Sequence, residues 1–183
     1  MNDAFCPILC WNVRGLNNPA RRAAVCELAT SAKAGILCLQ ETKMASIDAA
    51  AACEIAGPSR RSRLCLPAVG TRGGMAIFWN LVLVDISIPQ VLQFSISAVV
   101  TVLHSGFVFV ISTVYGPVDD ALKPDFLQEM RAISTGPGTP WLIAGDFNLI
   151  YEARDKNNLN LCRRLMGQFR VAIDHAEIFE LAC

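Results

Sequence analysis

The chain has 183 residues, which is enough for one domain with a hydrophobic core. Hydrophobic residues make up 53% of it, charged residues only 17%, and the formal net charge is zero. This composition excludes a disordered chain and a strongly basic protein that coats nucleic acids. Because the sequence contains no linker or low-complexity tract, we expect one domain over residues 1–183.

The hydrophobic pattern predicts that strands and helices alternate at the start of the chain. A strand at 8–13 precedes a helix for which Asn18 offers the N-cap and Pro19 the first residue, and a second strand follows at 36–40. Ser46 then offers the cap of a helix that runs to about residue 56.

Strands dominate the middle of the sequence, with predicted bounds of 63–66, 75–79, 81–88, 92–103 and 107–115. A helix to about residue 133, a strand at 141–144 and a last helix for which Asn160 offers the cap complete the pattern. Strands alternating with helices around a central antiparallel run predict a mixed α/β domain.

The uncharged stretch 86–118 is long enough to cross a bilayer, but polar residues interrupt it and His104-Ser105-Gly106 is typical of a turn. Partial alternation favours two paired strands, so we expect no transmembrane helix. The first residues lack the basic and apolar regions of a signal peptide, and none of the eight cysteines forms a C-x-x-C pair. We therefore expect an intracellular protein with reduced thiols.

Two groups of arginines are candidates for a nucleic-acid patch, although ordinary solvated charge explains them as well. They are Arg60, Arg61, Arg63 and Arg72, and Arg163, Arg164 and Arg170.

Four predicted strands end in residues that suit phosphate chemistry. Asn12 and Tyr115 lie at two of these ends, Glu41 follows a third, and Asp146 and Asn148 follow the fourth. Ligand sites in open α/β sheets gather at the carboxyl ends of strands, so these five residues could meet at one rim. Asp146 and Asn148, two positions apart, would face the same side if the chain stayed extended.

These residue types fit the hydrolysis of phosphodiesters. Mg²⁺ prefers one or two carboxylates and keeps its waters, which makes Glu41 the natural ligand. Asp146 could orient or deprotonate the attacking water. Asn12, Asn148 and Tyr115 can donate hydrogen bonds to phosphate oxygens without adding negative charge. Each residue alone also fits a plainer role, such as a strand cap, a solvated loop acid or an Asx-type turn, so the hypothesis depends on their joint occurrence.

The order of these motifs resembles the endonuclease/exonuclease/phosphatase superfamily, whose members share the DNase I-like fold. The resemblance covers the whole chain and is greatest to the endonuclease domain of plant non-LTR (LINE-type) retrotransposons. It lies in Trp-Asn-Val-Arg-Gly-Leu-Asn (11–17), Leu-Gln-Glu-Thr-Lys (39–43), Gly-Gly-Met-Ala-Ile-Phe-Trp (73–79), Thr-Val-Tyr-Gly-Pro (113–117) and Trp-Leu-Ile-Ala-Gly-Asp-Phe-Asn (141–148). The tail Arg-Asp-Lys-Asn-Asn (154–158) also resembles this retrotransposon subgroup.

The resemblance implies a four-layer α/β sandwich of two mixed sheets with helices outside. It implies Mg²⁺-dependent phosphodiester cleavage, with Mn²⁺ as a substitute and DNA as the substrate, and hence residence in the nucleus. By resemblance, Glu41 is the metal ligand and Asn12 organises metal and phosphate. Tyr115 contacts phosphate, and Asp146 with Asn148 positions the nucleophile.

The sequence also departs from the family. Members continue with a Leu-Asp-Arg-type block and a Ser-Asp-His block that carries the catalytic histidine, whereas this sequence ends at Cys183. His104 and His175 are expected to be bystanders, and position 14 is Arg where many members have an acid. We therefore expect a domain that lacks its C-terminal strands and is weakly active or inactive.

Two alternatives remain open at this point. The chain could be another phosphatase or phosphodiesterase of the same superfamily, or a non-catalytic remnant that binds DNA or protein. A serine hydrolase or P-loop enzyme finds no support, since neither Gly-x-Ser-x-Gly nor Gly-x-x-x-x-Gly-Lys-Ser/Thr occurs.

Overall fold

A computed structural model describes residues 6–70, 73–133, 138–155 and 162–181. Arg72 and Asn160, for which the sequence suggested roles, lie outside these residues, as do positions 156–158 of the retrotransposon-like tail.

The first half of the chain forms one mixed sheet with two helices. Its strands are β1 (Ile8–Asn12), β2 (Ile36–Gln40), β3 (Ser62–Leu66) and β4 (Met75–Trp79), in the order β1-β2-β4-β3. Helix α1 (Pro19–Ser31) connects β1 to β2, which run parallel, and α2 (Ala49–Ala56) precedes β3. The other pairs of this sheet are antiparallel.

The second half forms a second sheet with the order β5-β6-β7-β8. Its strands are β5 (Val84–Val91), β6 (Ser95–Val102), β7 (Phe107–Tyr115) and β8 (Trp141–Asp146). The short η1 (Asp120–Leu122) and helix α3 (Lys123–Ala132) connect β7 to β8, which again run parallel, and η2 (Ala153–Asp155) and α4 (Arg163–His175) follow. Each half therefore contains one strand-helix-strand unit with a parallel strand pair.

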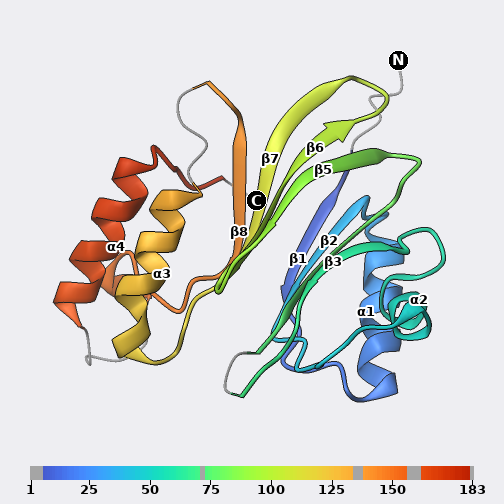
Figure 1. Cartoon of the computed structure of the whole chain (residues 1–183), viewed down its shortest axis with the longest axis horizontal. Coiled ribbons are helices and arrows are strands. Elements are labelled where there is room, and N and C mark those ends of the chain that lie inside the picture. Colours follow the sequence, from blue (N-terminus) through green and yellow to red (C-terminus); the bar gives the residue numbers. More distant parts are fainter. Residues whose placement is uncertain (1–5, 71–72, 134–137, 156–161, 182–183) are drawn as a thin grey trace.

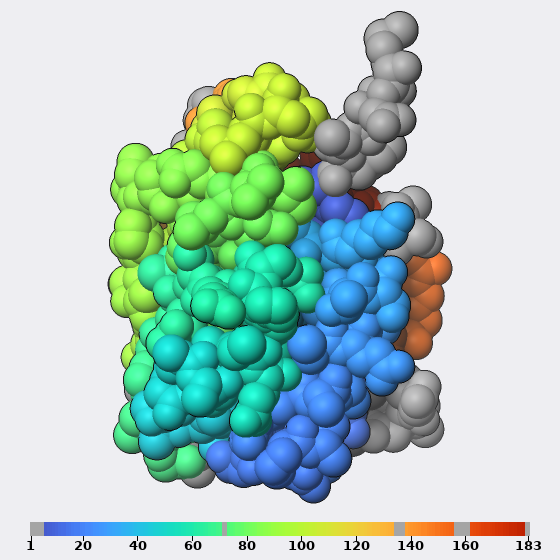
Figure 2. All heavy atoms as spheres, turned by 90° about the vertical axis from the view of Figure 1, so that its right-hand side faces the viewer, coloured from blue at the N-terminus to red at the C-terminus, as the bar shows by residue number. Residues whose placement is uncertain are grey.

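The two sheets pack face to face with helices on both outer sides, which confirms the expected four-layer α/β sandwich (Figure 1). Alternate residues of each strand separate into two cores. In β2, Ile36 and Cys38 enter the core between the sheets, whereas Leu37 and Leu39 pack under α1 and α2. Figure 2 looks onto the side covered by α1 and α2. Helices α3 and α4 cover the second sheet through a third, aromatic-rich core.

Local signals decided several element ends. The Asn18 side chain accepts a hydrogen bond from Ala20 N, and Pro19 opens α1, as predicted. Helix α2 begins later than predicted because Asp48, not Ser46, caps it through Ala51 N. Residues 81–83 form a turn after Asn80 instead of starting β5.

The uncharged stretch forms most of β5 together with β6 and β7, and the turn at 103–106 joins β6 to β7 as the sequence indicated. Within the described part of the chain, no helix is both long and apolar enough to cross a lipid bilayer.

Candidate functional site

The candidate site lies where the two parallel strand pairs end. Asn12 is beside Gln40 in the register of β1 and β2, and Tyr115 is beside Asp146 in the register of β7 and β8. Ile8 and Cys10 of β1 pack between the sheets, as does Leu142 of β8. Asn12 and Asp146 share their parity and therefore face the gap between the sheets.

Glu41 would face the wrong way if β2 continued as a regular strand. Gln40 occupies the inward parity of β2, so the next residue would point towards α1 and α2. Glu41 instead has a left-handed backbone with φ of 54°, which ends the alternation. This turn carries its carboxylate to the side where Asn12 and Tyr115 lie.

Four of the five predicted residues form one hydrogen-bonded cluster that joins the two sheets. The Tyr115 hydroxyl donates to Oε1 of Glu41 at 2.7 Å, and Nδ2 of Asn12 donates to Oδ2 of Asp146 at 2.8 Å. A longer contact of 3.5 Å links Nδ2 of Asn12 to the same Glu41 oxygen. The two short bonds join the first sheet to the second, whereas the longer contact lies within the first sheet. We name this set the Asn12–Glu41–Tyr115–Asp146 cluster.

Asn148, the fifth residue, adjoins the cluster in a way the sequence did not predict. The chain does not stay extended after Asp146, because Asn148 has φ of 48° and its N–H donates to Oδ1 of Asp146 at 3.1 Å. Its side-chain amide donates to the carbonyl of Gly116 at 2.8 Å. Asn148 therefore closes an Asx-type turn that orients Asp146, and its amide nitrogen is bound to backbone.

The electrostatics of the cluster favour a carboxylate beside a protonated phenol. Burial raises the pKa of the Glu41 carboxyl, but hydrogen bonds from Tyr115 and Asn12 and the charge of Lys43 outweigh it, so that the pKa is lowered. Burial, the hydrogen bond to Glu41 and the charges of Glu41 and Asp146 raise the pKa of Tyr115 well above its usual range. Tyr115 therefore remains a hydrogen-bond donor at neutral pH.

Strained backbone concentrates around this cluster. Arg14, Glu41, Lys43 and Asn148 are four of the seven non-glycine residues with positive φ in the described structure. Such residues cost about 1–3 kcal/mol each and gather at functional sites. Here they end the strands abruptly and place polar side chains at one rim.

Two glycines let the chain pass close to the cluster. A Cβ at Gly73 would lie 2.9 Å from the Tyr115 ring, and one at Gly116 would overlap the carbonyl of Phe147. Neither glycine was predicted to have a role, although both lie in the motifs that resemble the superfamily.

A cleft of about 710 Å³ opens beside the cluster. Asn12, Asp146 and Asn148 line it together with Leu165 and Met166 of α4. This volume is in the range of small-molecule and cofactor sites.

The oxygen donors of the cluster fit a hard cation better than a zinc ion. Among residues 6–70, 73–133, 138–155 and 162–181, no group of three or more His, Cys, Asp or Glu could hold a metal. Mg²⁺ needs only one or two carboxylates, however, because it keeps several waters. Oε2 of Glu41 lies 3.7 Å from the ammonium of Lys43, and the Glu41 side chain is 20% exposed. Glu41 therefore offers one carboxylate, and Asn12 beside it an amide oxygen, which fits the ligand set that Mg²⁺ prefers.

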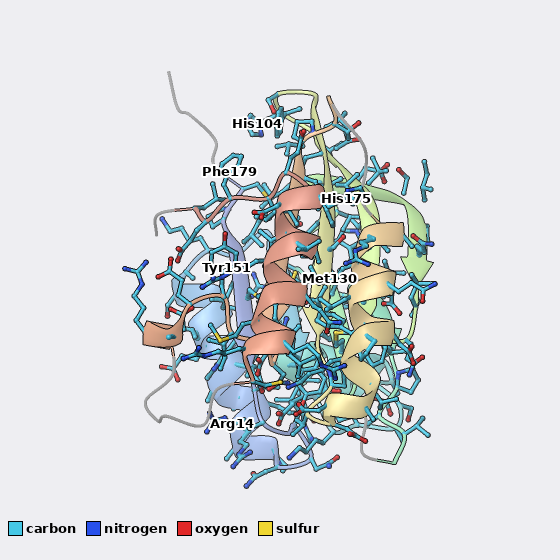
Figure 3. All side chains as sticks on the ribbon, turned by 90° about the vertical axis from the view of Figure 1, so that its left-hand side faces the viewer. Arg14, His104, Met130, Tyr151, His175 and Phe179 are labelled. Atoms are coloured by element: carbon cyan, nitrogen blue, oxygen red, sulfur yellow. The ribbon has the colours of Figure 1, made fainter. Side chains whose placement is uncertain are left out.

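Both histidines of the chain lie far from this rim. Figure 3 shows His104 and His175 at the end of the molecule opposite to Arg14, the residue that follows the rim residue Asn12 by two positions. His104 belongs to the turn between β6 and β7, and His175 ends α4. Neither can act on a group bound at the cluster.

Of the described members of the two arginine groups, one is buried, whereas Arg61, Arg163, Arg164 and Arg170 are exposed. Arg60 is only 5% exposed and donates to the carbonyl of Ala34 at 3.0 Å, so it belongs to the interior. The exposed Arg170 donates to the Tyr151 carbonyl and lies over its ring.

Sequence reasoning missed Lys43 and Gln40 as neighbours of the site. Lys43 was visible as a cation two positions after Glu41, and Gln40 as the one strongly polar residue of an apolar strand.

Comparisons with known proteins bear on the fold and the family of this chain. The sequence profile of the Endonuclease/Exonuclease/phosphatase family matches residues 9–177. No curated protein sequence matches the chain.

Several solved structures share the fold. The AP endonuclease LMAP from Leishmania major aligns over 92% of this chain with a TM-score of 0.66 and 16% identity. The human Nocturnin catalytic domain aligns over 79% (TM-score 0.62, 17% identity), and D. rerio TDP2 complexed with a single-strand DNA product over 78% (TM-score 0.60, 21% identity). This chain spans 66%, 64% and 60% of those three structures, respectively.

Proposed function

Because this chain belongs to the endonuclease/exonuclease/phosphatase family, we propose that its Asn12–Glu41–Tyr115–Asp146 cluster serves the Mg²⁺-dependent hydrolysis of phosphodiester bonds, with Mn²⁺ as a substitute. The family comprises phosphodiesterase, nuclease and phosphatase-type hydrolases. The supporting observation is the cluster itself, in which two carboxylates, an amide and a phenol from four strand ends meet in one hydrogen-bonded set.

Each residue of the cluster has a role that follows from its contacts. Glu41 and Asn12 would hold the cation, which when bound polarises a phosphoryl oxygen and offsets developing negative charge. Asp146 is held by Asn12 and by the Asn148 N–H, so it can accept a proton from water without swinging away. Tyr115 carries its proton at neutral pH, and its hydroxyl, which donates to Glu41 in this structure, can turn to donate to a phosphate oxygen instead.

We propose DNA as the substrate and a retrotransposon (LINE-type) endonuclease as the origin of this domain. The motif resemblance at 11–17, 39–43 and 141–148 supports this origin. Two of the similar solved structures are an AP endonuclease and TDP2 complexed with single-strand DNA product, which is consistent with a DNA substrate. Action on DNA would place the protein in the nucleus.

The rate of this chain is expected to be low. Neither His104 nor His175 lies near the cluster, and loss of general acid–base assistance costs about 10²–10⁴ in rate. The rival proposal is a non-catalytic module that binds DNA or protein. The distance of both histidines from the rim is the observation that favours this rival.

A plasmid-nicking assay separates these proposals. Purified protein is incubated with supercoiled plasmid and Mg²⁺, with EDTA as the metal-free control. Nicking should be slow, should require the metal and should vanish in Glu41→Gln. Glu54→Gln is the matched control, because Glu54 is a surface carboxylate on α2 that pairs with Arg22.

The outcomes distinguish nuclease, remnant and other hydrolase. Metal-dependent nicking that Glu54→Gln retains and Glu41→Gln loses would support a nuclease. Absence of cleavage together with DNA binding would support the non-catalytic module. Cleavage of inositol phosphates, sphingomyelin or poly(A) in preference to plasmid would support another hydrolase of the family.

A further inference from the structure

Beneath the cluster lies a second polar set that the proposed chemistry does not use. Gln40 is only 1% exposed, and its Nε2 donates to Oγ1 of Thr113 at 2.6 Å and to Sγ of Cys10 at 3.3 Å. Thr113 is fully buried. The Gln40–Thr113 bond joins the first sheet to the second, as the Glu41–Tyr115 bond does.

This second set lies two residues before the cluster on β1 and β7, further into the space between the sheets. Cys10 precedes Asn12 by two residues on β1, and Thr113 precedes Tyr115 by two on β7. Residues two apart on a strand face the same side. Gln40 directly precedes Glu41, whose left-handed backbone returns it to this side. The Cys10–Gln40–Thr113 set therefore lies directly beneath Asn12, Glu41 and Tyr115.

Packing alone would favour an apolar side chain at position 40. Burying an amide without hydrogen-bond partners costs about 1–3 kcal/mol of folding free energy. Ile36 and Cys38, on the same face of β2, fill the core without an amide and so avoid this cost. Apolar contacts between the sheets are also non-directional, so they resist separation more than sliding. A short hydrogen bond needs defined distance and angle, and it therefore fixes how the sheets lie relative to each other.

From this geometry we infer that Gln40 and Thr113 are positioning residues, which hold the two sheets in the register that lets Glu41 and Asn12 meet Tyr115 and Asp146. The inference rests on the proposed function, because it assigns these residues to the same metal and phosphate site. Neither residue touches the reacting groups. Loss of their bond should let the rim open and weaken cation binding.

The test uses Thr113→Val, which keeps the shape of the side chain and removes only its hydroxyl, and Gln40→Leu. The matched control is Ser112→Ala. Ser112 directly precedes Thr113 in β7 and is also fully buried, but its hydroxyl bonds Ser97 and Trp141 within the second sheet. Thr113→Ser, which restores a hydroxyl, is the rescue variant.

The first measurement is the dissociation constant of Mn²⁺, by paramagnetic resonance or calorimetry. Misplacing a positioned group by about 1 Å can cost about 10²-fold, and Gln40 and Thr113 act only through the positions of the ligands, so we expect a rise of about tenfold for Thr113→Val and Gln40→Leu. The double variant should bind no more weakly than either single variant, because both remove one shared bond. Thr113→Ser should recover binding, and Ser112→Ala should leave it unchanged. Equal weakening by Ser112→Ala and Thr113→Val would overturn the inference.

The second measurement does not depend on metal. The side-chain amide resonance of Asn12 in a ¹H–¹⁵N spectrum reports its bond to Asp146, which crosses the sheets. It should move in Thr113→Val and stay in Ser112→Ala. If the unaltered protein binds no Mn²⁺, the proposed function fails, and this resonance still decides the positioning role. An unmoved Asn12 resonance in folded Thr113→Val would reject that role.

Discussion

Gly73 is the position at which one added carbon should disturb the cluster without removing any functional group. A Cβ there would lie 2.9 Å from Cε1 of Tyr115 and 3.1 Å from Cγ of Glu41. The backbone of Gly73 is outside the left-handed region, so alanine adds no conformational strain. The Tyr115 ring must therefore retreat by about 0.5 Å to reach the 3.4 Å of ordinary contact.

The magnitude of the effect follows from this displacement. Misplacing a reacting group by about 1 Å can cost about 10²-fold in rate, so a shift of about half that size should cost about tenfold. Overpacking also destabilises a protein by about 1–3 kcal/mol. We expect Gly73→Ala to lower Mn²⁺ affinity and the nicking rate about tenfold, with a modest loss of thermal stability.

Gly167→Ala is the control for Gly73→Ala. Gly167 lies within α4, and an added Cβ meets no heavy atom within 4 Å. Alanine should stabilise this helix by about 0.5–1 kcal/mol and leave metal binding and nicking unchanged. The reasoning would be refuted if Gly73→Ala bound Mn²⁺ as tightly as the unaltered protein, or if both variants weakened binding equally.

Three further variants examine the cluster directly. Tyr115→Phe removes a charge-assisted bond and should destabilise the fold by about 1.5–3 kcal/mol in denaturant titrations, whereas Tyr151→Phe, at the only other tyrosine, should cost much less. The pKa of Glu41 in the folded protein is lowered from its ordinary value of 4.5. The ionised carboxylate therefore stabilises the fold above pH 4.5, and this stability is lost as the pH falls through the lowered pKa. Glu41→Gln should therefore narrow the difference in melting temperature between neutral and strongly acidic pH, and an undiminished difference would contradict the assignment. Asn12→Asp replaces the donor to Asp146 by a third carboxylate and should lower the melting temperature, with partial recovery in Mg²⁺; identical melting with and without Mg²⁺ would argue against a cation at the cluster.

The local pattern of the sequence was sufficient for most elements. Asn18 and Pro19 begin α1 as predicted, and β7 has the predicted bounds Phe107–Tyr115. These features depend on capping and on runs of apolar residues, which act over a few positions. In α1, Leu28 is 42% exposed, whereas Val25 and Ala29 are buried. A helix pattern does not specify which of several apolar faces finds a partner.

The sequence by itself determined which residues occupy the strand ends, and its ordered motifs indicated the family that the profile match shows. Tertiary structure decided how those residues meet. The left-handed backbone at Glu41, the turn that binds the Asn148 amide to Gly116 and the burial of Gln40 against Thr113 all depend on the second sheet or on chain remote in sequence. Side-chain direction at a strand end depends on one backbone angle and on a distant partner, and neither is encoded in the residue types around that position.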